Sequence, residues 1–266
     1  MAMALDWKTL EAFAEHLENA ELERRAITKI TDDCPDLSWE EAYAIQDCIR
    51  ARKVARGVRI TGLKMGLTSL AKMTQMGVED PIHGFITDYG MVPDGGEIAM
   101  DALIHPKVEA EVGFVLKRPL SGPGVDIDMV LAATDRIVPA VEVIDSRYRD
   151  FRFDLKSVIA DNTSAARYVV GSSTTPFAAS DLHRLNVVLE KNGSVVAEGV
   201  GATVLGHPAA SVAMLANMLG RKGEGWEVPA EALILTGGIT EAVPVARGDW
   251  IDVRYKDFGS VSLHFV

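Results

Sequence analysis

The stretch Val108-Glu-Ala-Glu-Val-Gly-Phe-Val-Leu116 combines the composition of a buried β-strand with two carboxylates. Successive side chains of a strand alternate between its two faces, so Glu109 and Glu111 point to one side and the intervening apolar residues to the other. A second apolar run, Ile137–Ile144, carries Glu142. Carboxylates that share an apolar surface repel one another and are costly to desolvate unless a cation joins them. We therefore predict that these three glutamates bind a divalent metal ion.

The donor atoms indicate the kind of ion. Three carboxylates suit Mg²⁺, Mn²⁺ or Ca²⁺ better than zinc, which prefers nitrogen and sulfur ligands. An alternative reading places Glu109 and Glu111 on a solvated strand face, because one Glu-x-Glu pattern is common on exposed strands. The apolar neighbours of Glu142 leave little room for such a face, but the residues by themselves leave both interpretations open.

Composition limits the classes of partner. The chain of 266 residues has a formal net charge of −11, and it lacks the basic stripe that binds a nucleic-acid backbone. No apolar run approaches the length that crosses a bilayer, and the first residues do not resemble a signal peptide. Two cysteines far apart in sequence, Cys34 and Cys48, indicate reduced thiols. We expect a soluble cytoplasmic protein without nucleic-acid or membrane partners.

Hydrophobic periodicity predicts an α+β protein. Residues 1–75 have helical character, with a capping box at Ser38 and Glu41 that begins a helix. Residues 76–266 contain strands separated by Gly, Pro and Asp, and Asn192-Gly193 is typical of a hairpin turn. We predict a helical N-terminal region packed on a mainly antiparallel β domain. The predicted strands are 60–65, 108–116, 137–144, 168–170, 185–189, 195–198, 233–236, 250–255 and 261–265; further helices are predicted at 209–219 and from residue 67 toward residue 77.

Several spaced motifs, covering nearly the whole chain, resemble the fumarylacetoacetate hydrolase superfamily. They resemble most closely its branch of 2-hydroxypenta-2,4-dienoate hydratases and 4-oxalocrotonate decarboxylases. The segments that carry the resemblance are Gly62–Ser69, His105–Phe114, Ile137–Ser146, Ile159–Ser164 and Leu233–Gly238, with the end of the chain to Phe265. The resemblance implies Mg²⁺ (or Mn²⁺) at the three glutamates and a catalytic domain of the mixed β-roll type.

Five further residues are candidates for catalysis. Lys64 reads as a solvated lysine on its own, but an acidic protein that binds an anionic substrate needs a local cation, and the resemblance places this lysine in the site. Asp161 and Asn162 suit an ordinary turn, or by resemblance a pocket wall. Asp80 and His83 lie in a Pro- and Gly-containing segment, which we predict to be a loop over the metal, with His83 as a candidate for proton transfer.

The resemblance also implies an activity. The first expectation is Mg²⁺-dependent decarboxylation of 4-oxalocrotonate (2-oxohex-3-enedioate) to 2-hydroxypenta-2,4-dienoate in the meta-cleavage degradation of aromatic compounds. The alternative is a 2-hydroxypenta-2,4-dienoate hydratase, which would use the same metal chelate but add water. A second alternative is a catalytically silent assembly subunit. The implied partners are a small 2-oxo dicarboxylate substrate and a sister hydratase in a hetero-complex.

Overall fold

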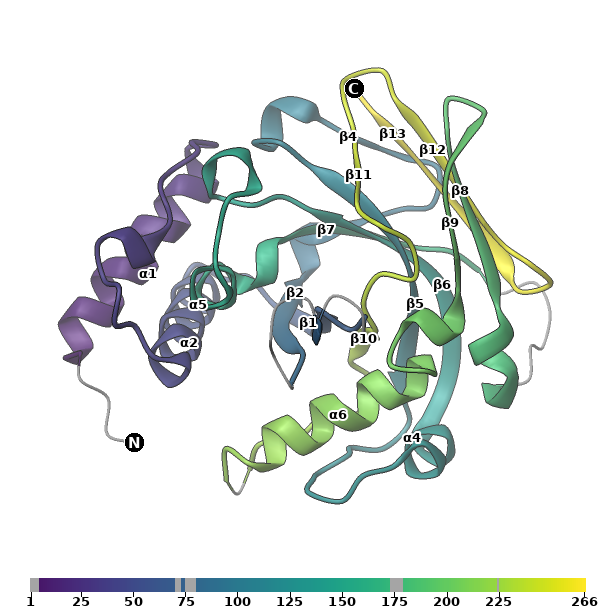
Figure 1. Cartoon of the computed structure of the whole chain (residues 1–266), viewed down its shortest axis with the longest axis horizontal. Coiled ribbons are helices and arrows are strands. Elements are labelled where there is room, and N and C mark those ends of the chain that lie inside the picture. Colours follow the sequence, from purple (N-terminus) through teal and green to yellow (C-terminus); the bar gives the residue numbers. More distant parts are fainter. Residues whose placement is uncertain (1–4, 70–72, 75–79, 173–178, 224) are drawn as a thin grey trace.

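The computed structural model describes residues 5–69, 73–74, 80–172, 179–223 and 225–266. A helical N-terminal region lies beside two β-sheets, which confirms the predicted α+β class (Figure 1). The described α-helices are α1 (Trp7–Leu22), α2 (Trp39–Ala55), α4 (Ile127–Ala133), α5 (Leu155–Ala160) and α6 (Pro208–Gly220). The described strands are β1 (Ile60–Gly66), β2 (Ile82–Thr87), β3 (Met91–Val92), β4 (Gly96–Ile98), β5 (Lys107–Leu116), β6 (Thr134–Ile144), β7 (Ala165–Val170), β8 (Asn186–Lys191), β9 (Ser194–Val200), β10 (Leu233–Leu235), β11 (Val243–Pro244), β12 (Trp250–Tyr255) and β13 (Gly259–Phe265).

The N-terminal helices begin at side-chain caps. Ser38 and Glu41 form the predicted capping box, in which each side chain accepts a hydrogen bond from the backbone N–H of the other. The buried faces of α1 and α2 belong to one apolar cluster that also contains residues of α5 and β2. The helical region is thereby held against α5 and the β2 end of the larger sheet.

The larger sheet has eight strands in the order β2-β1-β10-β5-β6-β7-β3, with β11 also paired to β5. Most neighbours are antiparallel, but β1 pairs with β10 and β3 with β7 in parallel, so the sheet is mixed. Strand β1 lies inside this sheet, although it precedes the division that we predict near residue 75. The helical part of the N-terminal region therefore consists of α1 and α2. The boundary between two domains near residue 75 stays a prediction.

The smaller sheet, β4-β13-β12-β8-β9, packs against one face of the larger one. Val112 and Phe114 of β5 share an apolar cluster with Leu263 and Phe265 of β13. Because side chains alternate along β5, the opposite face of the strand carries Glu109 and Glu111 away from this core. The curled arrangement is the predicted mixed roll (Figure 1).

Other sequence predictions have clear outcomes. The hairpin turn is confirmed, since Asn192 and Gly193 have φ of 55° and 77°. Both cysteines are free thiols. The helix expected from residue 67 toward residue 77 lies largely outside the described residues. Among the residues that the structure describes, no helix has the length and apolarity required to cross a bilayer.

Candidate metal centre and active site

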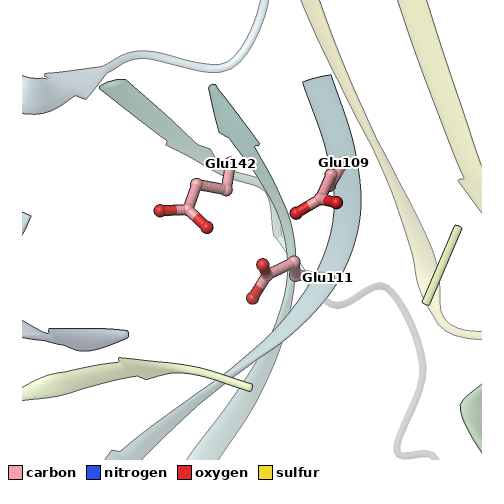
Figure 2. A group of neighbouring side chains, drawn as sticks. All are labelled: Glu109, Glu111 and Glu142. Carbon is pink, nitrogen blue, oxygen red and sulfur yellow. The ribbon is translucent and has the colours of Figure 1, made fainter. Parts of the chain in front are cut away.

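The three predicted glutamates converge on one point. Strands β5 and β6 are antiparallel, and their register places Glu109 directly opposite Glu142. Glu111 lies two positions further along β5, on the same face. One carboxylate oxygen from each residue lies within 4.8 Å of the others. Figure 2 shows the three side chains extending from the two neighbouring strands toward a common space.

The environment of these carboxylates fits a metal ion. Glu111 and Glu142 are 0% and 1% exposed. Burial, reinforced by the charge of Glu142, raises the pKa of Glu111 well above that of a solvated glutamate. Among the described residues, Oε1 of Glu111 and Oε1 of Glu142 have no hydrogen-bond partner, and Oε2 of Glu142 has only the ammonium of Lys64, 3.0 Å away. Buried oxygen atoms in this condition are destabilising by themselves, whereas a divalent cation with oxygen ligands would satisfy them.

Lys64 places a positive charge beside the three glutamates. Its Nζ lies 3.0 Å from Oε2 of Glu142 and donates a hydrogen bond of 3.1 Å to the carbonyl oxygen of Thr163. Burial opposes the charge of this side chain, but the three glutamates more than offset that effect and raise the pKa of Lys64. Lys64 is therefore a buried ammonium beside the three predicted metal ligands and not a solvated lysine.

A left-handed turn supplies the carbonyl that Lys64 binds. Asn162, Thr163 and Ser164 have φ of 48°, 50° and 59°, a conformation that costs free energy at each residue other than glycine. The buried ion pair between Arg147 and Asp161 holds the start of this turn, and the guanidinium also donates to the carbonyl oxygen of Asp161. Asp161 thus pairs with Arg147, and its carboxylate stabilises the turn.

Asn162 fixes the same turn to strand β2. Its Oδ1 accepts a hydrogen bond of 2.9 Å from the Phe85 N–H, and its Nδ2 donates one of 2.9 Å to the Phe85 carbonyl. Gly84 allows this close approach, because a Cβ there would lie 2.4 Å from Oγ1 of Thr163 and 2.7 Å from Oδ1 of Asn162. Asn162 therefore positions the Thr163 carbonyl, and through it Lys64.

Substituting Asn162 with Ala should lower both stability and turnover. The loss of both hydrogen bonds to Phe85 should cost about 1–3 kcal/mol in the free energy of unfolding, because the backbone groups of Phe85 stay buried. Turnover should fall further than stability explains, since the Thr163 carbonyl would move relative to Lys64. Urea denaturation and kcat of the folded protein would measure the two effects.

Asn192→Ala is the matched control for this prediction. Asn192 also has a left-handed φ, and its amide also bonds in both directions, to Asp249 and Trp250, but it lies in the β8–β9 hairpin. This variant should lose stability while its folded fraction keeps the wild-type kcat. Equal kcat values for the two variants would contradict a positioning role for Asn162.

A tyrosine of the smaller sheet supports strands β5 and β6. The hydroxyl of Tyr255 accepts a hydrogen bond of 3.2 Å from the Glu111 N–H and donates one to the carbonyl of Ala140. Glu111 and Ala140 are cross-strand partners, so the hydroxyl bridges β5 and β6 beside the predicted metal site. Sequence reasoning missed Tyr255, Arg147 and the Thr163 carbonyl, because no local pattern distinguishes them from ordinary core residues.

Two glycines that follow β10, Gly237 and Gly238, adjoin the glutamates. The Gly237 N–H donates a hydrogen bond of 2.7 Å to Oε2 of Glu111 and so orients a predicted metal ligand. Gly238 is required for space, since a Cβ there would lie 3.0 Å from the carboxyl carbon of Glu109.

The predicted metal site adjoins a cavity of about 160 Å³, which Glu109 helps to line. Its polar lining includes Lys64, Glu109 and Ser164, and Oγ of Ser164 is buried without a hydrogen-bond partner among the described residues. Much of the remaining described wall is apolar and is formed by side chains such as Ile82, Ile144, Phe151, Phe153, Leu155 and Val158. This arrangement can hold a small organic acid, with one end at an ion bound by the carboxylates and the other against an apolar surface.

The structure does not bring Asp80 and His83 together with the glutamates. Asp80 is partly exposed and forms an ion pair of 3.0 Å with Arg221. His83 lies in strand β2 and not in a loop as predicted, and its ring stacks on Tyr43 with centroids 4.5 Å apart. Burial lowers the pKa of His83 to about 3. Because strand side chains alternate, Ile82 lines the cavity while His83 faces the opposite side.

Comparison with known proteins decides the family. The family model described as "Fumarylacetoacetate (FAA) hydrolase C-terminal" matches residues 69–266. The chain belongs to the fumarylacetoacetate hydrolase family. Within this family it is 59% identical to 4-oxalocrotonate decarboxylase of Pseudomonas sp. (strain CF600) over 255 residues, which cover 96% of each chain. It is 36% identical to 2-hydroxyhexa-2,4-dienoate hydratase of Comamonas testosteroni, with 98% of each chain covered.

A solved structure of the family extends this similarity to the whole fold. The 4-oxalocrotonate decarboxylase from Pseudomonas putida G7, complexed with magnesium and adipate, superposes with a TM-score of 0.96. The two chains are 55% identical, and each is covered completely. The same enzyme has also been solved with calcium and acetate. Both ions prefer oxygen ligands, in agreement with the donor set of the present chain.

Proposed function

We propose that this member of the fumarylacetoacetate hydrolase family decarboxylates 4-oxalocrotonate to 2-hydroxypenta-2,4-dienoate and CO₂ with Mg²⁺ as its cofactor. The observation that carries the proposal is the three-glutamate centre at the edge of a small cavity with a largely apolar wall. The 59% identity to a 4-oxalocrotonate decarboxylase supports this assignment over the hydratase reaction, whose relatives are more distant.

Glu109, Glu111 and Glu142 would hold the ion, and Mn²⁺ fits the same oxygen ligands. Bound Mg²⁺ would supply Lewis-acid polarisation of the 2-oxo group of the substrate. In the reaction the bond to the distal carboxyl group breaks, CO₂ leaves, and the electron pair passes through the conjugated system to the ketone oxygen. Protonation of that oxygen completes the 2-hydroxy-diene.

The residues of the chain contribute charge, orientation and exclusion of water. The Lys64 ammonium lies beside the carboxylates, where it can stabilise negative charge on the substrate oxygens and hold a proton at Nζ. The Thr163 carbonyl orients that ammonium. The apolar wall around Phe153 and Val158 keeps water from the diene carbons. Hydration at C4 would require an added general base, and the only carboxylate in the described cavity lining is the metal ligand Glu109.

Incubation with 2-oxohex-3-enedioate and Mg²⁺ tests the proposal. We expect stoichiometric CO₂ release and the ultraviolet absorbance of 2-hydroxypenta-2,4-dienoate, both lost with a chelator. If the protein instead converts 2-hydroxypenta-2,4-dienoate to a 4-hydroxy-2-oxo acid without releasing CO₂, it is a hydratase. If neither reaction occurs and isothermal titration detects no Mg²⁺ binding, it is a catalytically silent subunit.

The proposal also covers the cellular compartment and the binding partners of the protein. The two free cysteines accord with a reducing compartment, and we place the protein in the cytoplasm. The substrate is a small 2-oxo dicarboxylate. Association with a sister hydratase, which the family resemblance implies, stays a prediction.

A further inference from the structure

Lys107 begins strand β5 on the face that carries the metal-binding glutamates. The alternation of side chains places residues 107, 109 and 111 on one side of the strand. Lys107 is half-buried, and its Nζ lies 4.1 Å from the centre of the Phe151 ring. Across the described ranges, this ammonium has no carboxylate within ion-pair distance. An unpaired cation is notable beside an acidic site in a chain with a net charge of −11.

Phe151 connects Lys107 to the active site. Its side chain lines the cavity that also contains Lys64 and Glu109. Asp150 and Phe151 have φ of 59° and 55°, so two consecutive residues other than glycine adopt the left-handed conformation. Backbone strain of this kind is maintained where a site depends on it. The turn holds the ring close to the Lys107 ammonium and to the His105 ring, whose centroid lies 4.9 Å away.

The charges of the site leave the second carboxylate of the substrate without a partner. The proposed substrate carries one carboxylate beside its 2-oxo group and another at the far end. Lys64 is already engaged by Glu142 and Thr163. The described lining of the cavity contains no other cation, and the wall that includes Phe151 is largely apolar. A distal carboxylate that reaches the edge of the Phe151 ring would approach the one unpaired ammonium on this face of β5.

We propose that Lys107 binds the distal carboxylate and thereby selects dicarboxylates. This inference rests on the proposed function. The ammonium lies over the Phe151 ring, and a carboxylate would replace this contact by a stronger charge-assisted hydrogen bond. No covalent step is involved. Lys107 is a substrate-binding residue, while Lys64 and the glutamates act at the 2-oxo end.

Kinetics should separate binding from chemistry. An ion pair with the carboxylate stabilises the bound substrate, and it weakens as that group leaves as neutral CO₂. Lys107→Met should therefore raise KM at least about tenfold without lowering kcat. Lys107→Arg should retain most of the wild-type KM, because it keeps the charge.

The decisive experiment compares two inert ligands by isothermal titration with the Mg²⁺-loaded protein. 2-Oxoadipate and 2-oxohexanoate have the same 2-oxo acid end and chain length and differ only in the distal carboxylate. We expect Lys107→Met to weaken 2-oxoadipate binding at least about tenfold and to leave 2-oxohexanoate binding unchanged. Lys117→Met is the matched control, since Lys117 is exposed just beyond the other end of β5, and it should change neither affinity.

Two results would overturn the inference. Unchanged 2-oxoadipate affinity in Lys107→Met would exclude the contact. Equal losses for both ligands would show that Lys107 supports the fold or the metal site and not carboxylate selection. Because these titrations require no turnover, they are independent of the decarboxylation test. A protein that releases no CO₂ but discriminates the two ligands through Lys107 would refute the proposed reaction alone.

Discussion

Replacing Glu111 with Gln should abolish Mg²⁺-dependent turnover while leaving the metal-free protein at least as stable as the wild type. Glu111 is fully buried beside Glu142, and without an ion the two carboxylates repel each other in a poorly solvated site. The amide of Gln removes one of these charges and can still accept the hydrogen bond from the Gly237 N–H. The same change removes a ligand from the ion, and we expect turnover to fall by at least about 10³.

Melting temperatures with and without Mg²⁺ distinguish the two effects. Saturating Mg²⁺ should stabilise the wild type by about 2.7 kcal/mol at 100 times the dissociation constant, because the ion binds only the folded chain. Glu111→Gln should show little or none of this increase. Glu198→Gln is a suitable control, since Glu198 is exposed on strand β9 of the smaller sheet. A full Mg²⁺-dependent rise in the melting temperature of Glu111→Gln would refute the metal site.

Replacing Lys64 with Met should reduce turnover by about 10²–10⁴, the range expected when a positioned proton donor and cation is lost. The effect on stability should depend on the ion. Lys64 is buried and paired with Glu142, so its loss leaves a buried carboxylate uncompensated in the metal-free protein. Breaking such a pair typically costs about 3–5 kcal/mol. Bound Mg²⁺ should restore much of that stability, because the ion compensates the same carboxylate.

The dependence on Mg²⁺ therefore separates a catalytic role of Lys64 from a structural one. Turnover of Lys64→Met at saturating Mg²⁺ should stay low even though the melting temperature recovers. Lys64→Arg should keep the buried charge and recover part of the activity. If turnover recovers together with stability when Mg²⁺ is added, the role of Lys64 is only to hold Glu142.

The metal centre could be predicted because it depends on local features of the sequence. Alternation along a strand determines that Glu109 and Glu111 share a face, and the apolar neighbours of Glu142 identify its segment as a second buried strand. Whether Glu109 and Glu142 lie next to each other across the β5–β6 pair depends on the register of the two strands, which only the structure shows. The capping box at Ser38 and the hairpin at Asn192 were predictable for the same reason, since each depends on residues close together in the chain.

How well the role of a predicted catalytic residue could be foreseen depends on how far away in the sequence its partners lie. Asp161 and Asn162 lie in the turn that faces Lys64, but their functions depend on Arg147 and on the backbone of Phe85, 77 residues before Asn162. His83 was predicted in a loop over the metal because Pro and Gly flank it. In the structure this segment pairs with β1, and the alternation of β2 turns Ile82 toward the cavity and His83 away from it.

The sequence by itself determined the composition of the predicted metal site and the α+β class, because strand alternation, helix capping and the desolvation cost of carboxylates act over a few residues. Only the tertiary structure decided which groups surround that site. The Thr163 carbonyl at Lys64, the Tyr255 hydroxyl between β5 and β6, and the Phe151 ring under Lys107 all come from segments that packing brings together. Such contacts depend on the relative placement of whole strands and turns, which the burial of the shared apolar core determines.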